Sequence, residues 1–148
     1  MHCATFAGVR RTGHSSHIYD ARAMDRIVVR ACTRLRAPAA YVAVLERSVV
    51  LLAEHGLRRE FFRVEPWEML ARRVAAASGP LAVSDTRLDG TLAPMRSVRA
   101  FIGTPFASGQ GALVVWDGRV RDIEPAALLY MQELGAELDA LRVGKIAS

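Results

Sequence analysis

The sequence contains very little cysteine: among its 148 residues, only Cys3 and Cys32 carry a thiol. Neither belongs to a Cys-x-x-Cys pair or lies beside spaced histidines, so the pattern does not predict a zinc site. Cys32 falls on the apolar face of a predicted helix, where a small buried hydrophobic side chain is the expected role. His14 and His17 are three residues apart, and that spacing alone is too little to indicate a metal. We therefore expect no metal site.

Long apolar runs are also missing. No stretch approaches the ~20 apolar residues that a membrane span needs, and residues 1–17 lack the apolar core of a secretory signal. A hydrophobic content of 51% with 24% charged residues is ordinary for a globular chain of one domain. These absences predict a cytoplasmic protein without membrane contact, in which a disulfide between the two cysteines is not expected.

Lysine is almost absent, since nineteen of the twenty basic residues are arginine and only Lys145 is lysine. The formal net charge is +5, yet the arginines are scattered, with doublets only at 10–11, 58–59 and 72–73. A nucleic-acid-binding face would concentrate them and would add a recognisable motif. Together with abundant alanine, valine and leucine, the arginines indicate a GC-rich bacterial genome. We interpret them as a solvated surface and expect no nucleic-acid partner.

The chain begins with an irregular segment and then becomes periodic. Glycines and serines interrupt residues 1–17, which predicts an irregular arm followed by a single domain over 18–148. Apolar residues at spacings of three and four predict a helix over 18–36. Either Ser16 or Asp20 can cap its start.

The middle of the chain alternates between strand and helix patterns. β-Branched and apolar residues at 41–46 and 49–55 predict two antiparallel strands joined by a tight turn. Neither strand alternates cleanly between apolar and polar residues, so both faces of the sheet should be covered. Pro66 suits the first position of a helix predicted over 66–77.

Three further strands and a final helix follow. The stretch PLAVSDTRLDGTLAPMRSVRAFIGTPFASGQGALVVWD predicts an acidic loop between the first two strands and a tight Gly-Gln-Gly turn between the last two. Proline removes a ladder hydrogen bond, so Thr104-Pro105 predicts a local bulge, and Gly103 would permit a close backbone approach. An apolar stripe predicts a helix over 125–143.

The predicted elements follow the order helix, two strands, helix, three strands, helix. No linker or internal repeat divides them. The order fits an α+β domain with a five- or six-stranded antiparallel sheet, whose N- and C-terminal helices stack on one face.

These motifs resemble those of a GAF domain. The elements are a PL-x-V-x-D strand, an acidic loop, V-R-A-F-x-G-x-P, a Gly-containing hairpin, G-A-L-x-V-x-D and an acidic-Pro start to the last helix. The resemblance covers roughly residues 20–143. It implies a PAS-like sheet of order 2-1-5-4-3 and a pocket opposite the terminal helices, roofed by 61–77 and 85–95. Members of the family bind cyclic nucleotides, haem, bilins or small metabolites and serve mostly as sensory or dimerisation modules.

The resemblance also limits which cofactors and reactions we expect. A bilin-binding member attaches its chromophore through a cysteine near the pocket, and Cys32 lies on the wrong element. Haem needs an axial ligand, which is usually a histidine. His55 lies at the end of a predicted strand, and a surface histidine is its simpler interpretation. Members that reduce free methionine sulfoxide use cysteines on the pocket loops, and the loop 85–95 contains none. We therefore expect no cofactor and no enzymatic activity.

The implied pocket has seven candidate ligand-binding residues. An Asp–Arg cluster beside an aromatic side chain can hold a polar metabolite. Two simpler roles stay open, because Asp85 can cap its own turn and Trp67 can fill the core. The candidates are Asp85, Arg87 and Asp89 on the acidic loop, Arg99 and Phe101 on the fourth strand, and Trp67 and Met69 on the roof.

Two functions remain as hypotheses. The first is a sensory or regulatory module of bacterial signalling that forms a homodimer through the helices at 20–35 and 125–143 and passes its signal to a partner by contact. Its basis is an apolar stripe on both helices that one sheet face would not fully bury. No output domain follows the last helix, which also favours action through a partner. The second is a protein that binds a small metabolite or nucleotide in the pocket.

Overall fold

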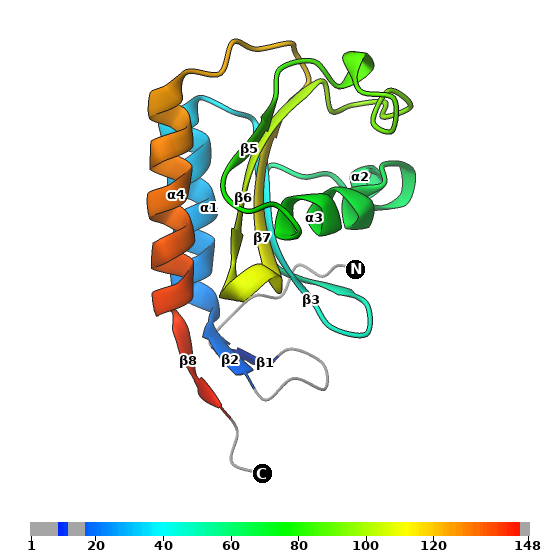
Figure 1. The fold of residues 1–148 in the computed structure, drawn as a ribbon. Coiled ribbons are helices and arrows are strands. Elements are labelled where there is room, and N and C mark those ends of the chain that lie inside the picture. Colours follow the sequence, from blue (N-terminus) through cyan, green and yellow to red (C-terminus); the bar gives the residue numbers. More distant parts are fainter. Residues whose placement is uncertain (1–8, 12–16, 146–148) are drawn as a thin grey trace.

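A five-stranded antiparallel sheet forms the centre of the computed structural model, which describes residues 9–11 and 17–145 (Figure 1). Its strands stand in the order β4-β3-β7-β6-β5. Numbered within this sheet alone, that order is 2-1-5-4-3, so the predicted topology is confirmed. The strands are β3 (Ala39–Leu45), β4 (Val49–His55), β5 (Leu81–Val83), β6 (Ala100–Phe106) and β7 (Gly111–Asp117).

Two long helices lie side by side on one face of this sheet (Figure 1). α1 spans Ala21–Leu35 and α4 spans Pro125–Ala140. Asp20 is the residue that caps α1, because its Oδ1 accepts a hydrogen bond from the Ala23 backbone N–H at 3.1 Å. The predicted placement of both terminal helices on one face is confirmed.

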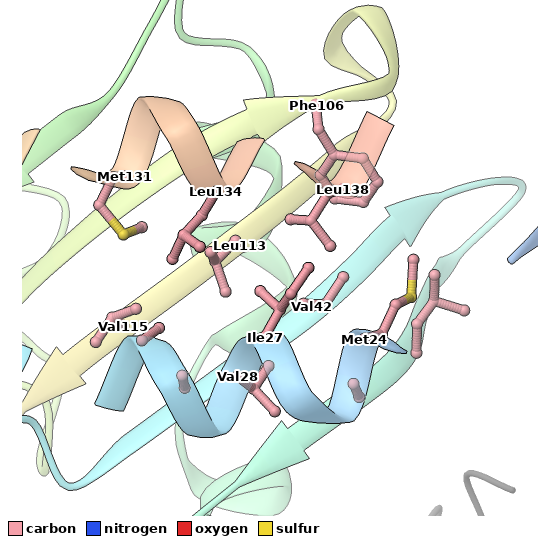
Figure 2. Packing of buried hydrophobic residues seen from close by; sticks show 14 of the residues in the cluster. Met24, Ile27, Val28, Val42, Phe106, Leu113, Val115, Met131, Leu134 and Leu138 are labelled. Atoms are coloured by element: carbon pink, nitrogen blue, oxygen red, sulfur yellow. The ribbon is translucent and has the colours of Figure 1, made fainter. Parts of the chain in front are cut away.

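The first hydrophobic core fills the space between the helix pair and the sheet (Figure 2). Side chains at spacings of three and four point inward from both helices and meet β-branched and leucine side chains of the sheet. Gly135 lets α4 lie close to β6, because a Cβ atom there would be 3.1 Å from the Pro105 carbonyl oxygen. The core includes Met24, Ile27 and Val28 of α1, Met131, Leu134 and Leu138 of α4, and Val42, Leu113 and Val115 of the sheet.

Two short helices and a loop cover the opposite face, so both faces of the sheet are covered as predicted (Figure 1). α3 (Trp67–Ala75) corresponds to the helix expected over 66–77, whereas α2 (Arg59–Val64) is an additional helix. The loop after β5 contains the 3₁₀ turn η1 (Thr86–Leu88). This second core includes Tyr41, Phe61, Leu70, Val74, Leu92, Met95, Phe101 and Val114.

A three-stranded sheet in the order β1-β2-β8 lies at the foot of the helix pair (Figure 1). β1 (Val9–Arg11) and β2 (His17–Asp20) precede α1, and β8 (Arg142–Lys145) follows α4. The expectation of an irregular arm over 1–17 is therefore wrong where these strands form, and the remainder of that arm lies outside the described residues. The helix predicted over 125–143 ends early because its last residues pair with β2 instead.

The bulge predicted at Pro105 is wrong. β6 pairs with β7 without a register shift, and Pro105 stands opposite Ala112. The proline is tolerated because β5 begins only at Leu81, which pairs with Gly103, so among the described strands β6 has no second neighbour at Pro105. Gly103 does permit a close approach, which is that of α3: a Cβ atom at Gly103 would lie 2.5 Å from the Val74 side chain.

The hairpin between β6 and β7 turns through η2 (Ala107–Gly109), which begins earlier than the expected Gly-Gln-Gly turn. Ala107 and Ser108 both have a φ of 54°, a backbone conformation that favours glycine. Asp139 of α4 supports this turn, because its Oδ1 accepts a hydrogen bond from the Ala107 backbone N–H at 2.6 Å. The hairpin is thereby attached to the helix pair.

Candidate functional site

An aromatic cluster occupies the sheet face on which the sequence predicts a pocket. Phe61 stacks on Trp116 with ring centroids 5.2 Å apart, and Phe62 meets Trp67 edge to face at 5.4 Å. The Tyr41 hydroxyl donates a hydrogen bond to the Trp67 carbonyl oxygen at 2.9 Å. Burial raises the pKa of Tyr41 well above its ordinary value. The protein's own side chains therefore pack across this face.

The three apolar candidate residues belong to this packing. Trp67 and Met69 are half-buried on α3, and Phe101 is buried on β6. Trp67 touches the rings of Tyr41 and Phe62, so the core-filling role that the sequence left open for it is the one the structure shows.

The charged candidates on the loop after β5 have partners of their own. Asp85 accepts hydrogen bonds from the Arg87 Nε at 3.1 Å and from the Arg87 backbone N–H at 3.0 Å, which lower the pKa of Asp85. This is the turn-capping role left open for Asp85. Asp89 pairs with Arg73 of α3 at 2.6 Å. That guanidinium, together with the Thr91 hydroxyl, holds the pKa of Asp89 far below its ordinary value.

Arg99 also bonds within this loop, because its Nη1 donates to the Met95 carbonyl oxygen at 2.7 Å. Its charge contributes only a small part of the lowered pKa of Asp85. The seven predicted residues thus lie on the same side of the sheet, but they do not form the single Asp–Arg cluster that the sequence suggested. Three pack as apolar side chains, and four make hydrogen bonds that fix the loop.

A buried carboxylate that sequence reasoning missed fastens the loop to the second core. Glu65 lies between α2 and α3 and is 4% exposed. Its Oε1 accepts a hydrogen bond from the Arg96 backbone N–H at 3.0 Å, and its Oε2 accepts one from the Ser97 backbone N–H. The hydroxyl of Thr86 adds a further tie by donating to the Val98 carbonyl oxygen at 2.8 Å. These bonds join the two ends of the loop and attach it to the segment between α2 and α3.

A cleft of about 400 Å³ lies on the other face, where α1 ends and α4 begins. Sequence reasoning missed it, because its walls come from the ends of separate elements. Its apolar lining includes Leu35, Ala37, Ile102, Val115, Ile123 and Ala127. Its charged lining consists of Arg34, Arg36 and Arg121 together with Asp117, Asp122 and Glu124.

Arg121 joins two walls of this cleft. Its Nη2 donates to the Leu35 carbonyl oxygen at 2.6 Å, and its Nη1 donates to the Arg36 carbonyl oxygen at 3.3 Å. A cation in this position satisfies the last carbonyl groups of α1 and complements the helix dipole. The same Nη1 lies 3.4 Å from Oδ2 of Asp117, which is buried at the end of β7. The segment between β7 and α4 is thereby fixed to α1.

The apolar stripes of α1 and α4 lie largely in the molecule's own core, while Leu35, Leu128 and Leu141 of the same stripes stay half-buried. Met24, Val28, Met131 and Leu134 are 0% exposed. A dimer contact through this helix pair would therefore have to use the residues that point away from the sheet.

The outer surface of the helix pair is mixed in character. Arg30 of α1 pairs with Glu137 of α4 at 2.6 Å, and the Arg34 guanidinium lies 4.9 Å from the centre of the Tyr130 ring. Leu129 of α4 is 62% exposed. These contacts link the two helices to each other while leaving a large apolar side chain in solvent.

Neither Cys32 nor His55 belongs to the second core, on the side of the predicted pocket. Cys32 is buried on α1, where burial raises the pKa of its thiol to about 11. His55 is exposed at the end of β4. Within 9–11 and 17–145, no group of histidine, cysteine or carboxylate side chains could hold a metal ion. No helix in those ranges is long and apolar enough to cross a membrane.

No protein-family model and no curated protein matches this chain. Among solved structures, the GAF domain of a phosphoenolpyruvate-protein phosphotransferase from Acinetobacter has a TM-score of 0.64 and 17% identity, over 82% of this chain and 80% of that chain. The blue-light-absorbing form of the PixJ GAF domain from Thermosynechococcus elongatus has a TM-score of 0.59 and 15% identity, over 82% and 85%. A free methionine-R-sulfoxide reductase from Neisseria meningitidis, in complex with its substrate, has a TM-score of 0.64 and 16% identity, over 81% and 75%. Together with the strand order and the helix pair, these similarities show that the chain has the fold of a GAF domain.

Proposed function

We propose that this chain is a sensory or regulatory module of bacterial signalling, which forms a homodimer and contacts its partner through the outer surface of α1 and α4. The shared fold supports this role, because GAF domains of a phosphotransferase and of the blue-light-absorbing PixJ have it. We propose no catalytic activity. The similar reductase acts on methionine sulfoxide, whereas the one cysteine among the residues described here, Cys32, lies on the opposite side of the sheet from the predicted pocket.

The outward-facing residues of α4 carry the proposal. Spacings of three and four residues alternate along this face, which is the pattern of a coiled-coil seam. Small side chains along such a seam let a second helix approach closely, and Leu129 at 62% exposure provides an apolar anchor. The exposed residues at these positions are Ala126, Leu129, Glu133, Ala136 and Ala140.

Sedimentation velocity of the full chain at micromolar concentration tests this proposal. We expect a dimer for the unmodified chain and a monomer for the Leu129→Glu variant, because the new carboxylate would be buried without a partner in the dimer. Leu88→Glu is the matched control, since Leu88 is 86% exposed on the loop at the other side of the sheet. A monomeric unmodified chain, or equal dissociation of the two variants, would refute the proposed contact.

One observation favours the alternative function, in which a small metabolite or nucleotide binds beneath the loop after β5. Nε1 of Trp116 is buried and has no hydrogen-bond partner within the described part of the chain. A buried donor without a partner is costly, and an acceptor atom of a ligand would satisfy it. The stacked ring of Phe61 beside Trp116 would give such a ligand an aromatic contact.

A thermal-shift screen separates the two functions. Nucleotides, amino acids and organic acids are the compound classes to test, because any ligand that binds only the folded chain raises its melting temperature. A shift that is lost in a Trp116→Phe variant would favour the alternative. The absence of a shift with every compound would favour action through protein contact.

A further inference from the structure

The cleft at the end of the helix pair carries charges that no partner neutralises. In the described part of the molecule, the side chains of Arg34 and Arg36 form no ion pair, and neither do those of Asp122 and Glu124. All four residues are exposed. The cleft therefore offers two cations and two anions to a molecule that enters it, and the Arg34 cation lies over the ring of Tyr130, which also lines the cleft.

The two signs of charge come from different segments of the chain. Arg34 and Arg36 stand at the C-terminal end of α1, whereas Asp122 and Glu124 belong to the segment that leads into α4. Arg121 ties this segment to the end of α1, so the positive and negative sides are held in a defined relation. Apolar residues of both helices and of the sheet complete the lining of the cleft.

We propose that this cleft binds a small zwitterion whose two charged ends flank an apolar body, which is the chemistry of an apolar dipeptide with free termini. A ligand with one charge would leave the opposite pair of side chains uncompensated. The carboxylate would pair with Arg34 and Arg36, and the ammonium with Asp122 and Glu124. The volume of about 400 Å³ suits a ligand of this size.

This site lies on the helix-pair side of the sheet, whereas the predicted pocket lies on the other side, and Phe101 and Trp116 of the second core also border this cleft. A bound dipeptide would touch the end of α1 and the start of α4 together, and these are the two helices of the proposed dimer contact. The proposal extends the proposed function but does not rest on it, because dipeptide binding and sedimentation are measured independently.

Isothermal titration with three matched probes tests the charge requirement. The probes are L-leucyl-L-leucine, its N-acetyl derivative and its C-terminal amide, so that each blocked form lacks one charge. We expect the free dipeptide to bind and each blocked form to bind at least about tenfold more weakly, as the loss of a charge-assisted contact predicts. No heat from the free dipeptide at ~10 mM, or equal affinity of the blocked forms, would overturn the proposal.

Variants of the full chain test the location of the site. Arg36→Gln and Asp122→Asn should each weaken dipeptide binding at least about fivefold, because each removes a charge from one side of the cleft. Arg47→Gln, in the turn between β3 and β4, should leave the affinity unchanged. In the unmodified chain, the dipeptide should shift amide resonances within 34–37 and 121–127. Shifts confined to the loop after β5 instead would place the ligand in the other pocket and refute this site.

Discussion

Replacing Arg121 with alanine should lower the free energy of unfolding by about 2 kcal/mol, because a partner of a buried carboxylate is lost and two carbonyl groups are left uncapped. The Asp117 side chain is 6% exposed, and that of Arg121 is 33% exposed. Since the arginine keeps some contact with water, the loss should be smaller than that for a fully buried pair. Urea denaturation measured by circular dichroism would give the difference.

Arg119→Ala is the matched control for this variant. Arg119 lies 3.7 Å from the same carboxylate, but its side chain is 85% exposed. Its replacement should change the free energy of unfolding by less than about 0.5 kcal/mol, as is typical of an exposed ion pair. Equal losses for the two variants would show that the tie to α1 contributes nothing.

Glu65→Ala should lower the free energy of unfolding by about 2 kcal/mol as well, because charge-assisted hydrogen bonds to two backbone N–H groups disappear from a buried position. The effect should be local. Amide hydrogen exchange at Arg96 and Ser97 should become faster than in the unmodified chain, since both lose their acceptor. Exchange measured by NMR, together with urea denaturation, would report both changes.

Two further variants separate the role of the Glu65 carboxylate from the general effect on stability of replacing a glutamate in this region. Glu65→Gln keeps one carbonyl oxygen as an acceptor, so its loss of stability should fall between those of the alanine variant and the unmodified chain. Glu68→Ala removes an exposed carboxylate from the first turn of α3 and should have little effect. Unchanged exchange at Arg96 and Ser97 in Glu65→Ala would contradict the proposed fastening of the loop.

Much of this fold could be predicted because its signals are local. The spacing of Met24, Ile27, Val28 and Ala31 is sufficient to indicate the buried face of α1, and these side chains do pack on the sheet. The order of strands came from the resemblance to a known family rather than from periodicity. Short elements were missed for a physical reason: α2 and β8 have too few residues to show a period, and tertiary pairing decides their conformation.

The candidate site was harder to predict because it depends on partners far away in the chain. Glu65 accepts hydrogen bonds from residues 31 and 32 positions later, and Arg121 bonds to a carbonyl group 86 positions earlier. No local pattern marks such pairs. The candidate Asp85 illustrates the opposite case, since its bonds to Arg87 are local and the turn-capping role was foreseeable. The prediction of a bulge at Pro105 was wrong for a related reason. β5 is too short to reach Pro105, and the sequence alone does not show that this edge of β6 is therefore unpaired.

Thiol cross-linking at the outer face of α4 tests the central claim, which is that copies of this chain meet through the helix pair. The variant is Ala136→Cys in a background where Cys3 is replaced by serine. Cys32 is buried, and its raised pKa of about 11 protects it from the reagent. With a short bismaleimide at micromolar protein, we predict a covalent dimer for Ala136→Cys and a monomer for Leu88→Cys in the same background. A monomer for Ala136→Cys, or equal cross-linking at both positions, would contradict the account.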